Sequence, residues 1–174
     1  MKIFYKILGN TLFASVTNFF VWFAMTFWLY LETRSVLATS FAGGMFMAVM
    51  ALSSFWLGSI VDHNTKKRAM VISTVTTLVA FASALLIYMS APVGAFTTVA
   101  SPWLWAVVVS ILVGVIAGNI RGIVLPTLVT LLVSADSRDK ANGLSGMVMG
   151  LSSVGAGMTS GLVLAHAGMQ WVLI

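Results

Sequence analysis

The sequence predicts an all-α membrane protein, a polytopic bundle of helices. Of its 174 residues, 60% are hydrophobic and only 7% are charged, whereas a soluble domain covers its surface with roughly 25% charged residues. Apolar stretches of roughly 20 residues, long enough to cross about 30 Å of hydrocarbon, recur along the chain between short polar segments. We therefore expect a single transmembrane domain over residues 1–174, surrounded by the lipid bilayer.

The charged and polar residues exclude several functional classes. The nine Lys and Arg residues are too few and too scattered to follow a phosphate backbone, so we expect no nucleic-acid partner. The sequence contains no cysteine, which rules out disulfides, thiolate zinc sites and cysteine nucleophiles. Four acidic residues and two histidines, without an HExxH motif, a phosphate-binding loop or a dinucleotide fingerprint, offer little for catalysis. We expect no enzyme activity, no metal site and no cofactor.

The first predicted span covers about residues 11–31. The basic start, Met1–Lys6, is typical of a signal peptide, but the apolar run after it is too long for one and lacks a small-residue cleavage site. We therefore expect this segment to remain as a membrane helix. Asn18 is the one strongly polar residue inside the span, and it either bonds a neighbouring helix or contacts a substrate in a cavity.

The second and third predicted spans cover about residues 36–61 and 69–89. A tight turn at 32–34 separates the second span from the first, because too few residues lie between them for a longer loop. A charged segment, residues 58–68, lies between the second and third spans.

The fourth predicted span covers about residues 103–124. Pro126 is expected to end or bend this helix, and residues 127–134 to lie at the membrane surface as a connector. The fifth span covers about residues 141–164. The last residues, 171–174, have the character of the first turn of a sixth span, so we expect the chain to be a fragment or a truncated product of a longer one.

The cations predict the orientation of the bundle. Seven of the nine fall on one side of this five-span arrangement, and the positive-inside rule places that side in the cytoplasm. We therefore expect a multi-pass protein of the cell membrane, of the bacterial inner-membrane type, with a cytoplasmic N-terminus. The seven cations are Lys2, Lys6, Lys66, Lys67, Arg68, Arg138 and Lys140.

Glycines recur at helical spacing in the fourth and fifth spans. Such rows place small residues on one face of a helix, where a neighbouring backbone can approach closely. The sequence therefore predicts two helix-packing faces. The row in the fourth span contains Gly114, Gly118 and Gly122, and the row in the fifth contains Gly146, Gly150, Gly157 and Gly161.

The charged segment combines an acid, a glycine and three adjacent cations. A carboxylate at the end of a membrane helix is costly to desolvate alone, so Asp62 should reach water, a cation or a helix N-terminus. Gly58, one turn earlier, lets another helix approach because it carries no side chain. For Lys66, Lys67 and Arg68 a second interpretation remains open, namely that they only set the topology.

The spacing of these residues resembles the loop between helices two and three of the major facilitator superfamily of secondary transporters. That loop has Gly, three residues, Asp, a basic residue, any residue, Gly and a basic pair. Gly58, Asp62 and the pair Lys66–Lys67 match this pattern, whereas His63 replaces a basic residue and Thr65 replaces a glycine.

The resemblance implies a fold and a role for the segment. The chain would form the N-terminal half of a twelve-helix transporter, with five complete spans and the start of a sixth, and the C-terminal half would be its partner. The segment would latch the two halves together in the outward-facing state. In that role Asp62 accepts hydrogen bonds, while Lys66, Lys67 and Arg68 hold the loop.

Arg121 is a second candidate for a mechanistic role. It lies roughly 27 Å along the fourth span, at a depth similar to that of Asp62, if each residue rises about 1.5 Å. An ion pair between Arg121 and Asp62 would lower the cost of placing both charges in the membrane. Alternatively, Arg121 extends its side chain to the inner membrane surface.

The region after Arg121 resembles one branch of the same superfamily, the enterobactin exporters and macrolide-efflux proteins. In that branch an arginine, a Pro-x-Leu-Val connector and an Ala-Asn start of the fifth helix follow one another. Here the corresponding residues are Arg121, Pro126–Val129 and Ala141–Asn142. The two resemblances together cover about residues 57–164.

The two resemblances together imply secondary active transport, namely the export of a small amphiphilic molecule or drug that is driven by an ion gradient. The partners would be that small-molecule substrate and the C-terminal half of the transporter. An alternative is a small multi-pass membrane protein that acts as an assembly or regulatory subunit.

Overall fold

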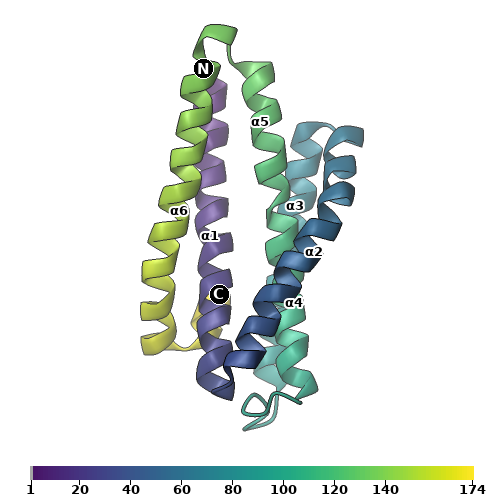
Figure 1. Ribbon diagram of the computed structural model, residues 1–174, viewed down its shortest axis with the longest axis vertical. Coiled ribbons are helices and arrows are strands. Elements are labelled where there is room, and N and C mark those ends of the chain that lie inside the picture. The colour runs from purple at the N-terminus through teal and green to yellow at the C-terminus, as the bar shows by residue number, and fades with distance from the viewer. Residues whose placement is uncertain (1) are drawn as a thin grey trace.

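The computed structural model describes residues 2–174, which are mainly helical with no β-strand among them (Figure 1). Five stretches are long and apolar enough to cross a membrane: α1, α2, α3, the pair α4–α5, and η1 with α6. This is the architecture of a multi-pass helical membrane protein, which confirms the predicted fold class at that level. The elements are α1 (Lys2–Thr33), α2 (Val36–His63), α3 (Lys66–Ser90), α4 (Pro102–Gly118), α5 (Ile120–Leu132), the 3-10 turn η1 (Ala135–Ser137), α6 (Arg138–Ala167) and α7 (Met169–Leu173).

Helix α1 begins at Lys2, well before the predicted start of the first span at residue 11. The additional turns are held by packing, because Phe4 and Leu8 are buried in a cluster with Leu125 and Val129 of α5. Tertiary burial thus extends the helix beyond the segment that hydropathy alone marks as membrane-spanning.

The sequence predicts that Pro126 ends or bends the fourth span, and the structure contradicts the first of these alternatives. It lies inside α5, which continues to Leu132, so residues 127–132 are helical and belong to the same long apolar stretch as α4. A proline inside a membrane helix is tolerated when neighbouring helices hold the segment in place. Here Val124 and Leu128 are buried against Leu57, Val61 and other residues of a shared cluster.

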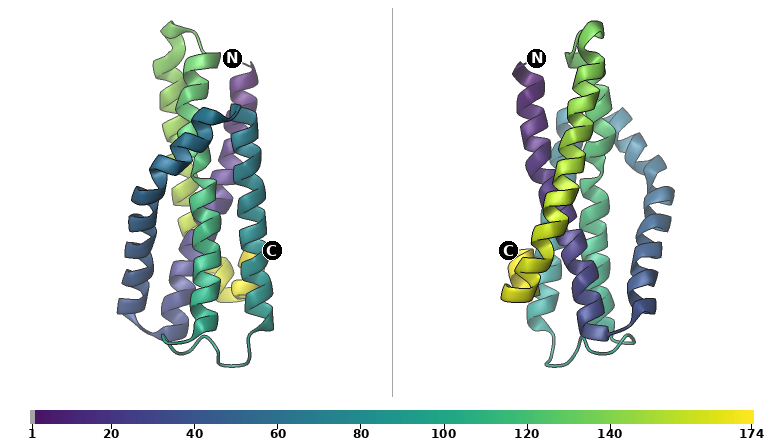
Figure 2. Two further views of the ribbon diagram at one scale, coloured as in Figure 1. Left: turned by 90° about the vertical axis from the view of Figure 1, so that its right-hand side faces the viewer. Right: turned by 60° about the vertical axis from the view of Figure 1, so that its left-hand side comes forward.

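Two helix pairs form the body of the bundle. Helix α1 packs along α6, α3 packs along α4, and α1 also contacts α4 at the centre. Helix α2 lies on the outside of the bundle (Figure 2), and it exposes large apolar side chains that a bilayer or another helix would cover. These side chains are Leu37, Phe41, Met47, Leu52, Phe55 and Trp56.

The connections fall at two opposite ends of the bundle. The N-terminal end of α1, the α2–α3 turn and the α5–α6 connection lie at one end, which we call the basic end (Figures 1 and 2). The α1–α2 turn and the α3–α4 loop lie at the other. Because the basic end carries the seven cations that the sequence groups together, the fold keeps them on one side. Helix α7 turns back after α6 and packs against α1, α3 and α6, with Met169 buried in the main apolar cluster.

Candidate functional site

The α2–α3 turn is held by contacts within its own residues. The side chain of Asn64 donates to the carbonyl of Ile60 at 2.9 Å, and the hydroxyl of Thr65 accepts from the backbone N–H of Arg68 at 3.3 Å. Thr65 is the N-cap of α3 and has a φ of −61°, an ordinary value for any residue. The threonine at this position therefore starts the helix, and the turn does not require the glycine of the family pattern.

Asp62 points away from the bundle at the end of α2. Its side chain is 79% exposed, and its carboxylate lies 4.0 Å from the amine of Lys66. That amine instead donates to the carbonyl of Val61 at 2.8 Å. An exposed pair of this kind contributes little to stability. At Gly58, no described atom lies within 4 Å of the position that a Cβ would occupy, so residues 2–174 do not supply the helix expected to approach there.

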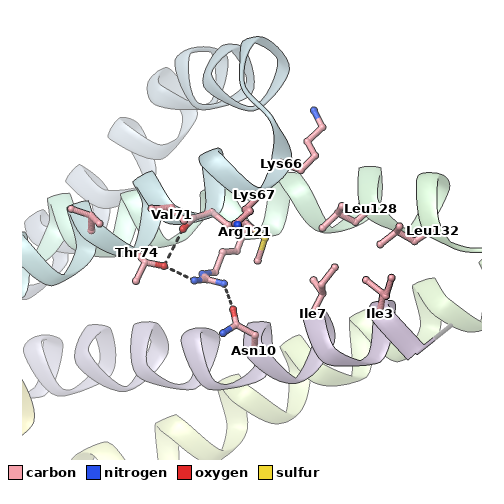
Figure 3. A pocket seen from close by; sticks show the side chains of 12 residues that line it. Ile3, Ile7, Asn10, Lys66, Lys67, Val71, Thr74, Arg121, Leu128 and Leu132 are labelled. Carbon is pink, nitrogen blue, oxygen red and sulfur yellow. Dashed lines mark hydrogen bonds between the residues drawn. The ribbon is translucent and has the colours of Figure 1, made fainter.

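Arg121 does not pair with Asp62, so the predicted ion pair is replaced by other contacts. Its guanidinium donates to the side-chain oxygen of Asn10 at 2.7 Å and to the hydroxyl of Thr74 at 2.5 Å (Figure 3). The Thr74 hydroxyl in turn donates to the carbonyl of Met70 at 3.0 Å. Arg121 is thus held between α1 and α3 by neutral groups, and it does not extend toward the basic end of the bundle.

A pocket of about 620 Å³ lies beside Arg121, between α1, α3 and α5 (Figure 3). We call it the Arg121 pocket. Arg121, Asn10 and Thr74 form its deep end, while Lys66 and Lys67 line its mouth at the basic end of the bundle. Its remaining walls are apolar and consist of Ile3, Ile7, Met70, Val71, Val75, Leu128 and Leu132.

A second, smaller pocket of about 180 Å³ shares Arg121 and Thr74 with the first. Asn18 lines it and donates from its side-chain nitrogen to the carbonyl of Val115 on α4 at 3.1 Å. The Oδ1 atom of Asn18 is buried and accepts no hydrogen bond within the described chain. The side-chain nitrogen of Asn18 therefore bonds a neighbouring helix, while its side-chain oxygen has no hydrogen-bond donor among the described residues.

The regular α-helical hydrogen bonding of the fourth span has a break at Asn119, between α4 and α5, although Asn119 keeps right-handed helical dihedral angles and the helix direction continues. The side chain of Asn119 donates to the same Val115 carbonyl, at 2.8 Å, that Asn18 uses. Hydroxyls of α3 bond two more carbonyls near this break: Ser73 donates to Ala117 at 2.8 Å, and Thr77 donates to Gly114 at 3.0 Å. Side chains of adjacent helices thus donate hydrogen bonds to backbone carbonyls around the break, where no water is available in a membrane interior.

The two glycine rows differ in what they contact. A Cβ at Gly114 would lie 2.5 Å from the ring of Phe81, and one at Gly118 would lie 2.6 Å from Oδ1 of Asn18. Gly157 and Gly161 make ordinary contacts with Phe23 and Phe27, because a Cβ there would lie 3.6 and 3.7 Å from those rings. The space around the other three, Gly122, Gly146 and Gly150, is open. The close approach is therefore greatest in the fourth span.

The fold gathers Asn18, Lys66, Lys67 and Arg121 along two adjoining pockets. Four other polar residues that line these pockets belong to none of the sequence motifs, namely Asn10, Thr74, Ser73 and Thr77. One signal was available, since Ser73 and Thr77 are spaced by one helical turn inside an apolar helix.

Among the described residues, no group of three or more His, Cys, Asp or Glu side chains is placed to hold a metal ion. Comparison of the chain with models of known families, with curated proteins and with solved structures found no match. The fold itself defines the class, a multi-pass helical bundle with five stretches long and apolar enough to cross a membrane and a cationic pocket between three of its helices.

Proposed function

We propose that this bundle is the N-terminal half of a secondary transporter of the major facilitator type, and that the transporter exports a small amphiphilic molecule by using an ion gradient. The observation that carries the proposal is the Arg121 pocket. It has a volume within the range of small-molecule sites, apolar walls and a few polar groups gathered at one end. Helical bundles commonly hold small molecules in pockets between their helices.

The position of Arg121 supports a functional role for the pocket. Charged side chains inside membrane spans are costly, and those that persist face a bundle interior or a cavity. Arg121 lies within the fourth span and bonds Asn10 of α1 and Thr74 of α3, so three spans meet at its guanidinium. A change in the relative position of these spans would alter the pocket, and this is the property that a transport site needs.

Another hollow is less suited to a substrate that carries a polar group. It has a volume of about 1010 Å³ and lies between α2 and the start of α4, where its walls are apolar residues and two serines. No charged side chain lines it. In the membrane, this surface would be covered by lipid or by another helix.

The proposal is tested by measuring accumulation in bacterial cells that lack their own efflux pumps and express the full-length protein. A panel of fluorescent amphiphiles with anionic, neutral and cationic head groups would be loaded, with and without a protonophore. We expect at least one probe to accumulate less in expressing cells, and the protonophore to abolish the difference. The variant Arg121→Ala should lose the effect, whereas Lys140→Gln, an exposed cation at the same end, should retain it.

If no member of the panel shows a gradient-dependent difference while the protein is correctly inserted, the transport proposal is refuted. Stable co-purification of the inserted protein with another membrane protein would then favour the assembly-subunit alternative.

A further inference from the structure

We propose that the Arg121 pocket binds an amphiphilic anion, with a carboxylate or phosphate at Arg121 and an apolar tail along α1 and α5. This inference rests on the proposed function, because it names the substrate class of the same site. It is carried by the charge of the pocket, by the hydrogen-bonding groups at its deep end and by the character of its walls.

The charge of the pocket is positive and is not balanced by its own lining. Arg121 keeps its charge at any physiological pH, and Lys67 lines the same pocket nearer the mouth. No acidic side chain lines the pocket; Asp62, beside Lys66, is 79% exposed and is not a lining residue. A cation surrounded by neutral groups in a membrane protein is stabilised by a counter-charge, which a bound anion would supply.

The guanidinium of Arg121 keeps unused hydrogen-bond donors at the deep end of the pocket. The guanidinium has five N–H groups in a planar fork, and two of its hydrogen bonds go to Asn10 and Thr74. The contact occupies the side-chain oxygen of Asn10, so the amide nitrogen of that residue remains as a further donor. The remaining N–H groups suit the two oxygens of a carboxylate or a phosphate.

The walls between the deep end and the mouth suit an apolar tail. Along α5, Arg121 and Leu132 are separated by about 16 Å at 1.5 Å per residue, and Leu128 lies between them on the same pocket. Ile3 and Ile7 face these residues from α1 (Figure 3). The amine of Lys66 points away from the pocket, so its aliphatic stem is what lines the mouth.

The test is a binding measurement on the purified full-length protein in nanodiscs of phosphatidylcholine, with empty nanodiscs as the blank. Three probes with the same tail would be compared: dansyl-undecanoate, its methyl ester and the corresponding dansyl-alkylamine. We expect the undecanoate to bind at least about tenfold more tightly than the ester, as a charge-assisted hydrogen bond implies. The amine should bind most weakly of the three.

Variants show which residues cause the tighter binding of the acid than of its ester. Arg121→Gln should remove it, so that acid and ester bind alike, whereas Lys140→Gln should leave it unchanged. Lys67→Gln, at an exposed position on the pocket wall, should reduce it by a factor of about three without affecting folding. Equal binding of acid and ester by the unmodified protein would overturn the proposal. So would a preference that survives both Arg121→Gln and Lys67→Gln.

The anion could be a free amphiphile or the head group of a membrane lipid, and a second arm separates them. Replacing part of the phosphatidylcholine with phosphatidylglycerol should weaken undecanoate binding if the lipid occupies the pocket, and should leave it unchanged if it does not. Failure of the two proposals can be told apart. Binding without gradient-dependent efflux refutes transport alone, and efflux of neutral or cationic probes without an anion preference refutes this inference alone.

Discussion

The side chain of Asn18 rests against the backbone of Gly118. Its nitrogen bonds the carbonyl of Val115 one turn earlier in α4, and a Cβ on Gly118 would lie 2.6 Å from its oxygen. The pair joins the first and fourth spans near the break at Asn119, next to the two pockets that share Arg121. The absence of a side chain at residue 118 is thus what allows these spans to approach.

Gly118→Ala should destabilise the protein. The added methyl would force Asn18 to move and would strain its hydrogen bond to α4, which we expect to cost about 1–3 kcal/mol, as overpacking does in other tightly packed regions. Gly122→Ala, one turn later in open space, is the matched control and should be neutral or slightly stabilising. Thermal unfolding in detergent would measure both. Equal effects of the two substitutions would show that the contact at residue 118 is unimportant.

Ser73→Ala should also destabilise the bundle, by a smaller amount. The Ser73 hydroxyl is buried and bonds the Ala117 carbonyl of another helix, so its loss should cost about 0.5–1.5 kcal/mol. Ser83 bonds the Ala80 carbonyl of its own helix, and Ser83→Ala should stay within about 0.5 kcal/mol of the unmodified protein. Chemical unfolding of the two variants side by side provides the measurement. The role of Ser73 between helices would be rejected if both variants matched the unmodified protein.

Arg34→Gly should stabilise the turn between α1 and α2. Arg34 has a φ of +51°, a conformation that is unfavourable for residues with a Cβ and open to glycine. The gain should be at most about 1 kcal/mol, because glycine is also more flexible in the unfolded chain. Arg34→Ala removes the same charge but keeps the Cβ, so it should give no gain. A higher melting temperature for both variants would attribute the effect to charge and not to backbone conformation.

Introduced thiols should report the orientation of the bundle, since the chain has no cysteine of its own. Ala135→Cys lies in the α5–α6 connection at the basic end, and Val93→Cys lies in the exposed α3–α4 loop at the other end. If the positive-inside rule holds, an impermeant maleimide applied to intact cells should label residue 93 but not residue 135. The reverse pattern would place the basic end outside the cell.

Asp62→Asn should lower efflux by about tenfold or more if Asp62 latches two halves of a transporter, because a carboxylate accepts stronger hydrogen bonds than an amide. Insertion and stability should not change, since Asp62 is exposed and makes only a weak contact with Lys66. Asp139→Asn, an exposed acid in the first turn of α6, is the control and should transport normally. Normal efflux by the Asp62 variant would remove this residue from the mechanism.

Part of the candidate site could be foreseen from the sequence and part could not. Arg121 and Asn18 are visible as polar residues inside apolar spans, because hydropathy marks any such residue regardless of its neighbours. Their partners are not visible in this way. Whether Arg121 meets Asp62 or Asn10 depends on which helices are adjacent and how each is rotated, and a single sequence does not encode those relations as a local pattern.

The sequence by itself determined the membrane class, the five long apolar stretches and the grouping of cations at one end, since these follow from composition and from the length needed to cross a bilayer. The tertiary structure decided the rest. Helix α1 begins at Lys2 because its first turns pack against α5. Helix α5 continues past Pro126 because neighbouring helices bury it. The Ser73 hydroxyl of α3 bonds the carbonyl of Ala117 next to the break at Asn119. These features depend on contacts between residues far apart in the chain, which form only when the helices are assembled.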